Sequence, residues 1–137
     1  MKKQIVNWMC SAVLLGCAAQ VQADVSVIVH PSNNAVIDQS AIKRIFLGKA
    51  SSFPDGGKSI PVVLKGDAAD EFNQKVLDKS TNQLKSYWSK LVFTGKGTPP
   101  QEADQSEMLN LIANNPDLIG FVPKGSETGD VKVVASF

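Results

Sequence analysis

Cysteine and histidine are almost absent from this sequence of 137 residues. Both cysteines, Cys10 and Cys17, lie within the first 23 residues, and His30 is the single histidine. Residues 24–137 therefore contain no thiol for a disulfide, for nucleophilic catalysis or for a cysteine metal site. Zinc sites of the usual kind combine several His or Cys ligands, which one histidine does not supply. The sequence predicts neither a bound metal nor a cofactor.

No recognisable catalytic frame surrounds the one histidine. His30 follows a strand-like segment, which is a common place for sites in α/β proteins. A general base needs a partner and a reacting group within hydrogen-bond reach, and no G-x-S-x-G nucleophile segment is present. We expect His30 to be a loop residue and the protein not to be an enzyme, with a hydrolase as the least favoured function.

Excess charge of either sign is also lacking. The formal net charge is +1 for the whole sequence and becomes −1 once Lys2 and Lys3 are removed. Nucleic-acid-binding domains carry a basic face, which nothing here indicates. No basic amphipathic helix points to a membrane surface.

The sequence contains a single apolar run of note, and it lies within the first 23 residues. Lys2 and Lys3 precede an apolar run over 5–19, and Val21-Gln22-Ala23 gives a small-residue exit. This order is typical of a signal peptide, and the run is shorter than the roughly 20 residues that a membrane span needs. We expect residues 1–23 to be removed, leaving a periplasmic protein that starts at Asp24 and is not inserted in the membrane. In the alternative, Cys17 in Leu14–Cys17 is lipidated.

The remainder, 24–137, is predicted to be a single α/β domain. Short β-branched or apolar runs predict strands, and apolar spacing of three and four residues predicts helices. Such alternation indicates a mixed, mainly parallel sheet covered by helices. We expect the tail from Leu118 to pair as an antiparallel hairpin. The predicted strands cover 25–29, 60–64, 118–122 and 131–134, and the predicted helices begin near Ser40, Asp67, Leu84 and Asp104 with Glu107 as a capping pair.

The clearest helical pattern lies just before the loop Gly95–Thr98. Its apolar residues share one face: Leu84, Tyr87, Trp88, Leu91 and Val92. We expect this face to lie in or near the core, although the two aromatic rings suit stacking on a ligand as well. Gly95–Thr98 lacks the P-loop spacing and follows a helix, so a helix-ending loop is expected there.

The best candidate for a binding site is the turn between the strand ending at Leu64 and the next helix. A helix N-terminus at the end of a strand presents free backbone N–H groups to an anion. Lys65 adds charge and Gly66 permits close backbone approach. The alternative is an ordinary helix start with Asp67 as its N-cap. The predicted ligand-binding residues are Lys65, Gly66, Asp67, Ala68 and Ala69.

Several segments, in order, resemble the substrate-binding proteins of phosphate ABC transporters in the type 2 periplasmic binding protein superfamily. Ser40–Lys49 resembles their I-F-x-G-K segment, and Val25–Val29 resembles the V-x-x-x-V strand before it. Ile60–Val63 resembles the strand before their ligand loop, and Trp88 falls where they carry a helical Trp. Asn114–Val122 is similar to their P-G-x-I-G-Y-V segment. The resemblance runs through nearly all of 24–137 and covers about the second lobe of a family member.

The resemblance implies a three-layer sandwich lobe of the periplasmic-binding-protein type and capture of an anion. The family's ligand loop reads roughly R-x-D-G-S-G-T. Asp67 matches its Asp and Lys65 stands near its Arg, whereas Ala68, Ala69 and Asp70 replace the hydroxyl-bearing stretch. The directions of the Asp70 and Glu71 carboxylates then decide whether an anion is accepted.

Two functions of different classes follow. In the first, the protein is a periplasmic solute-binding-like protein that binds phosphate or a related small anion weakly. In the second, the lobe has no ligand and serves as a protein–protein module for a membrane transporter or sensor. An exposed apolar patch would favour the second.

Overall fold

The computed structural model describes residues 24–137. The signal peptide expected over 1–23, and the alternative of lipidation at Cys17, lie outside the described residues. Five strands and four helices make up the described part. No helix among these residues has the length and apolar character that a membrane crossing requires.

The strands form one mixed sheet in the order β3-β2-β4-β1-β5. The central β4 runs parallel to β2, and β2 runs parallel to β3, whereas β1 is antiparallel to both β4 and β5. The predicted α/β class with a mixed sheet is confirmed. The strands are β1 (Val25–Val29), β2 (Ile60–Leu64), β3 (Gln101–Ala103), β4 (Leu118–Pro123) and β5 (Lys132–Ser136).

The expected hairpin between the last two strands is wrong, because β1 lies between them. Ser26 pairs with Val122 of β4 on one side and with Ser136 of β5 on the other. All five residues of β1 are buried. A buried strand with an open edge would leave its backbone N–H and C=O groups without partners, so pairing on both edges satisfies them.

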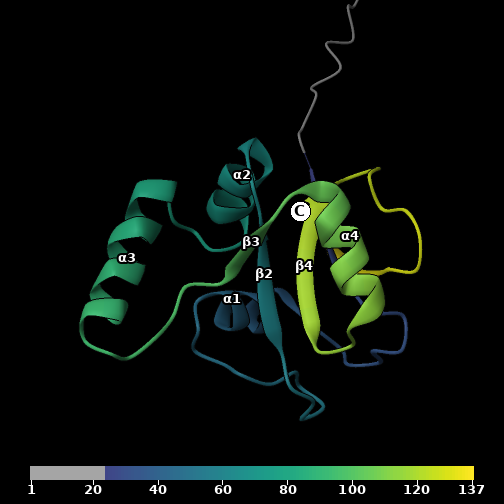
Figure 1. Cartoon of the computed structure of the whole chain (residues 1–137), viewed down its shortest axis with the longest axis horizontal. Coiled ribbons are helices and arrows are strands. Elements are labelled where there is room, and N and C mark those ends of the chain that lie inside the picture. The colour runs from purple at the N-terminus through teal and green to yellow at the C-terminus, as the bar shows by residue number, and fades with distance from the viewer. Residues whose placement is uncertain (1–23) are drawn as a thin grey trace, which may run out of the picture.

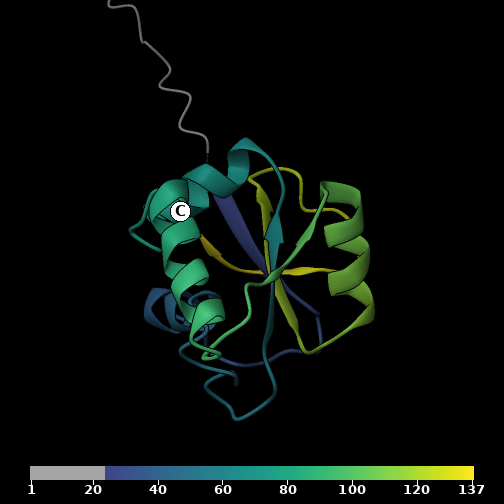
Figure 2. The same ribbon diagram turned by 60° about the vertical axis from the view of Figure 1, so that its left-hand side comes forward.

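Helices cover both faces of the sheet, which gives three layers (Figures 1 and 2). In Figure 2, α4 (Gln105–Asn114) stands on one side of the sheet. On the other side lie α1 (Gln39–Phe46) and α2 (Asp67–Lys75), with α3 (Thr81–Phe93) set outside them. The predicted three-layer arrangement is therefore confirmed.

Three phenylalanines fix the helices to the sheet. Phe72 of α2 stacks on Phe121 of β4 with ring centroids 4.0 Å apart. Phe46 of α1 meets Phe72 edge-on, with centroids 4.7 Å apart. All three rings are at most 1% exposed. Such rings contribute both buried apolar area and favourable ring geometry, so they hold α1 and α2 firmly in place.

The starts of two outer helices are capped by their own side chains. Asp104 accepts a hydrogen bond from the backbone N–H of Glu107 at 2.8 Å, as the sequence predicts for this helix start. Ser80 and Gln83 form a reciprocal capping box at the start of α3. These caps satisfy backbone N–H groups that a helix cannot pair internally.

Candidate functional site

A groove of about 810 Å³ lies between α2, α3 and the ends of β2 and β3. In Figure 1, α3 stands apart from the sheet. Phe46 and Leu64 are among the residues that line the groove. Ala69, Asp70 and Asn73 contribute from α2. From α3 come Thr81, Leu84, Lys85, Trp88, Ser89 and Val92.

The predicted corner between β2 and α2 forms one end of this groove. Lys65, Gly66, Asp67 and Ala69 line it, whereas Ala68 is not among the lining residues. Gly66 has φ 96° and is the N-cap of α2, without a side-chain cap hydrogen bond. Few residues other than glycine adopt this backbone conformation readily.

The alternative that Asp67 caps the helix is therefore wrong by one position. Asp67 is the first residue of α2, and the glycine before it takes the non-helical conformation of the cap. Because glycine has no side-chain oxygen, no side chain caps the N–H groups of the first helical turn.

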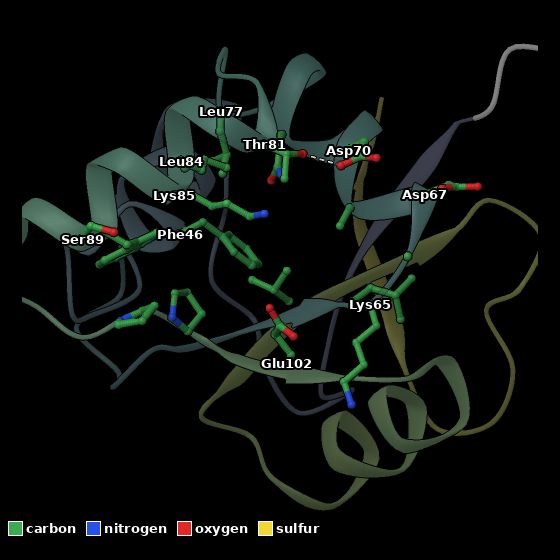
Figure 3. A pocket seen from close by; sticks show the side chains of 18 of the residues that line it. Phe46, Lys65, Asp67, Asp70, Leu77, Thr81, Leu84, Lys85, Ser89 and Glu102 are labelled. Atoms are coloured by element: carbon green, nitrogen blue, oxygen red, sulfur yellow. Dashed lines mark hydrogen bonds between the residues drawn. The ribbon is translucent and has the colours of Figure 1, made fainter. Parts of the chain in front are cut away.

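The charged side chains of the corner turn away from the groove (Figure 3). Lys65 runs from the end of β2 toward α4, and Asp67 points to the far side of the corner. The charge of Lys65 instead acts on Asp104 at the start of α4. Hydrogen bonds from Glu107 and Ser106 hold the pKa of the Asp104 carboxyl below its usual value of 3.8, and Lys65 adds to that effect.

The carboxylates of Asp70 and Glu71 take different directions. Asp70 lines the groove and accepts a hydrogen bond from the Thr81 hydroxyl on the facing helix (Figure 3). Glu71 is not a lining residue, and its carboxylate lies 3.6 Å from the Lys75 amine one turn along α2. Of these two acids, only Asp70 faces a molecule entering the groove.

Three polar residues of the groove are not among those predicted from the sequence. The amine of Lys85 projects into the groove from α3, and Glu102 projects into it from β3 (Figure 3). Asn73 lines the groove from α2 and is 6% exposed. Among residues 24–137, neither Lys85 nor Glu102 forms an ion pair. Lys85 directly follows Leu84 in the apolar pattern of α3, which is the one signal in the sequence that places it near the groove.

Solved structures with this arrangement include two phosphate-transport proteins. A phosphate ABC transporter substrate-binding protein of Clostridium perfringens, with bound phosphate, superposes with a TM-score of 0.60 at 16% identity. An ABC-type phosphate transport receptor of Vibrio cholerae gives 0.55, also at 16% identity. In both cases 82% of this chain is covered.

At the level of the fold, the chain resembles these phosphate-binding proteins. It spans less than half of each of them, 45% and 46% of their lengths. No protein-family model matches the sequence, and neither does any curated protein.

Of the adjacent aromatic residues Tyr87 and Trp88 of α3, only Trp88 contributes to the groove wall. Tyr87 and Trp88 are half-buried and pack on the edge of the core. The Tyr87 hydroxyl donates to the backbone carbonyl of Leu47 at 2.6 Å, which ties α3 to the end of α1. Trp88 lines the groove. A Cβ added at Gly48 would lie 3.0 Å from its ring.

The two remaining sequence candidates lie outside the groove. His30 follows β1, and one of its ring nitrogens lies 2.7 Å from the Ser32 hydroxyl. Gly95–Thr98 ends α3, as expected, and Gly97 packs against Trp88 and Leu91. Neither His30 nor Lys96 lines the groove.

Proposed function

We propose that this chain is a periplasmic solute-binding-like protein related to the substrate-binding proteins of phosphate ABC transporters, and that it binds small oxyanions weakly. The observation that carries the proposal is the shared fold, together with a groove at the corner between β2 and α2. In this proposal residues 24–137 form a single lobe of that type. The protein transports or presents its ligand and does not transform it.

The corner offers an anion the N-terminus of α2. Its first backbone N–H groups have no side-chain cap, and the positive end of the helix dipole lies at the groove. In the proposed site, Lys65, Gly66, Asp67, Ala68 and Ala69 form the turn around the oxyanion. Lys85 adds a positive charge that projects into the same groove from α3.

Carboxylates at the same groove make the binding weak. Asp70 and Glu102 both line it. Two unit charges 4 Å apart repel by about 1 kcal/mol in water and by roughly 4 kcal/mol at an effective dielectric constant near 20. Because a micromolar dissociation constant corresponds to about 8 kcal/mol, repulsion of this size reduces affinity toward the millimolar range.

Isothermal titration with inorganic phosphate tests this function. The protein is expressed from the whole sequence in a Gram-negative host and purified as the host processes it. We expect measurable heat at millimolar phosphate, and weaker binding in Ala69→Asp, which adds a carboxylate at the groove. Ala113→Asp is the matched control, because Ala113 is also half-buried but lies on α4. No heat from the unchanged protein at millimolar phosphate would contradict the proposal.

The location in the cell is tested separately on the same preparation. We expect the protein in the periplasmic fraction with Asp24 as its first residue. An acylated Cys17 at the N-terminus, detected by mass spectrometry, would favour the lipoprotein. A cytoplasmic protein that retains residues 1–23 would contradict both forms of export.

A protein–protein module is the second candidate, and the end of α3 favours it. Phe93 is 92% exposed and Val92 is 53% exposed. Adjacent exposed apolar side chains of this size are typical of contact surfaces. In this version the lobe docks through α3 onto a membrane transporter or sensor.

Site-specific crosslinking distinguishes the module from the anion binder. A photoreactive amino acid is placed at Phe93, and in a control protein at Val36, which is 87% exposed in the connection between β1 and α1. The module predicts a discrete adduct with a transporter or sensor subunit from position 93 and none from position 36. Equal adducts from both positions, or none, would contradict it.

A further inference from the structure

The groove is much larger and more apolar than a phosphate ion requires. Its volume of about 810 Å³ falls in the range of roughly 300–1,000 Å³ that holds organic ligands. Its apolar side chains include Phe46, Leu77, Leu84, Trp88, Val92 and Pro100. An inorganic anion would leave most of this surface in contact with water, whereas an apolar group would cover it.

Asn73 supplies a polar group without a partner inside this apolar surface. It lines the groove and is 6% exposed. Among residues 24–137, no hydrogen bond of its side-chain amide is found. Asn73 has no fully enclosed polar atom without a partner, so its amide reaches the groove and is available to a molecule there. Its NH₂ group can donate to an oxyanion.

Lys85 supplies the charge. Its amine projects into the groove from α3 and forms no ion pair with a described carboxylate (Figure 3). Asp70, which also faces the groove, already accepts a hydrogen bond from Thr81. An amide donor on α2 and an ammonium group on α3 thus line the same groove.

We infer that the natural ligand is an organic anion with an apolar body, such as an aryl or alkyl phosphate. Its charged head binds at the corner between β2 and α2, with Asn73 and Lys85 as further donors, and its body covers Leu84, Trp88 and Val92. The carboxylates of Asp70 and Glu102 limit what the head contributes, so the apolar body provides much of the affinity. This inference rests on the proposed function, because it names the ligand class of the same groove.

Calorimetric titration with three probes tests the ligand class: phenyl phosphate, inorganic phosphate and phenol. The protein is prepared from the whole sequence, as for the phosphate titration. We expect phenyl phosphate to bind about tenfold more tightly than inorganic phosphate, because burial of an aromatic ring adds at least that much. Phenol should bind more weakly than phenyl phosphate by a similar factor, because it lacks the charged head.

Three other outcomes of these titrations would overturn a part of the inference or all of it. Equal affinity for phenyl phosphate and inorganic phosphate would overturn the apolar body and leave the proposed function standing. Equal affinity for phenyl phosphate and phenol would overturn the anionic head. Binding of none of the three would overturn the inference and the proposed function together.

Two variants, each with a matched control, test where the charged head of the ligand binds. Lys85→Gln should weaken phenyl phosphate binding at least fivefold, whereas Lys90→Gln, an exposed site on α3 that does not line the groove, should leave it unchanged. Asn73→Asp should weaken phenyl phosphate binding more than Lys85→Gln does. Asn82→Asp, at an exposed site, is its control. Circular dichroism checks that the Asn73 variant folds. If the Asn73 variant does not fold, the comparison of Lys85→Gln with Lys90→Gln decides. Unchanged affinity in Lys85→Gln would overturn the proposed head site.

Discussion

The two helices on the flanks of the sheet, α4 and α3, differ in how their apolar residues are used. Met108 and Ile112 of α4 are completely buried against the sheet. Of the 13 residues of α3, Leu84 alone is buried. Both helices have side-chain caps at their starts. A similar periodicity thus makes a sealed core on one flank and the wall of an open groove on the other.

This contrast separates stability from binding. The flank of α4 and the three central phenylalanines hold the helices on the sheet, whereas α3 has a single buried residue and leaves the groove open. Regions with few buried apolar contacts open at a lower free-energy cost than the core does.

Removing a central ring should cost far more than removing the exposed ring of α3. Phe72 is fully buried and stacked on Phe121, so Phe72→Ala should lower the free energy of unfolding by about 3–5 kcal/mol. Phe93 is 92% exposed, and Phe93→Ala should change it by less than about 0.5 kcal/mol. Urea denaturation measures both. Similar losses in the two variants would mean that α3 belongs to the core.

Adding a methyl group should separate the two flanks in the same way. A Cβ at Gly120 would overlap the Met108 sulfur, so Gly120→Ala should lower the free energy of unfolding by about 1–3 kcal/mol. At Gly97, beside the groove wall, the nearest atoms would be 3.5 Å away, and Gly97→Ala should be nearly neutral. Thermal melts of both variants test this. A neutral Gly120→Ala would show that α4 packs less tightly than described.

The anchor of α3 should have a smaller and more local effect. Tyr87→Phe removes the hydrogen bond to the Leu47 carbonyl and should lower the free energy of unfolding by about 1 kcal/mol. Hydrogen exchange should become faster in the amides of α3 and stay the same in α4. Faster exchange in both helices would argue that α3 opens only with the whole domain.

The smallest effect should come from the cap of α4 and depends on pH. Hydrogen bonds from Glu107 and Ser106 lower the pKa of Asp104 below 3.8 in the folded protein. The stabilisation is therefore present above the unfolded pKa and is lost as the pH falls through the folded pKa. Relative to Asp104→Asn, the unchanged protein should lose stability between about pH 5 and pH 2. A difference in melting temperature that stays constant over this interval would contradict the assignment.

Most of the fold could be predicted from local pattern. The strands 25–29 and 60–64 follow from short β-branched runs, and Gly48 marks the end of α1. β3 was not predicted, because Gln101–Ala103 is too short and polar to show a strand pattern. It forms a strand by pairing with β2. The hairpin expected after Leu118 was wrong because strand partners depend on distant residues of β1.

The site was predictable only in part. The corner at Gly66 follows from a glycine between a strand and a helix, and it does lie at the groove. Asn73, Lys85 and Glu102 come from three different elements, so only the tertiary arrangement brings them to one groove. The periodicity of α3 identified which face is apolar. It could not tell that the neighbouring elements leave this face half uncovered.

The position of Trp88 has a practical consequence. It is the sole tryptophan after residue 23, and its ring forms part of the groove wall. Its fluorescence therefore responds to the environment of this one place and not to an average over several indoles. A molecule that displaces water from the ring should shift the emission toward the blue. In a variant with Trp8→Phe, Trp88 would be the single tryptophan of the whole sequence and an optical reporter for ligand screening.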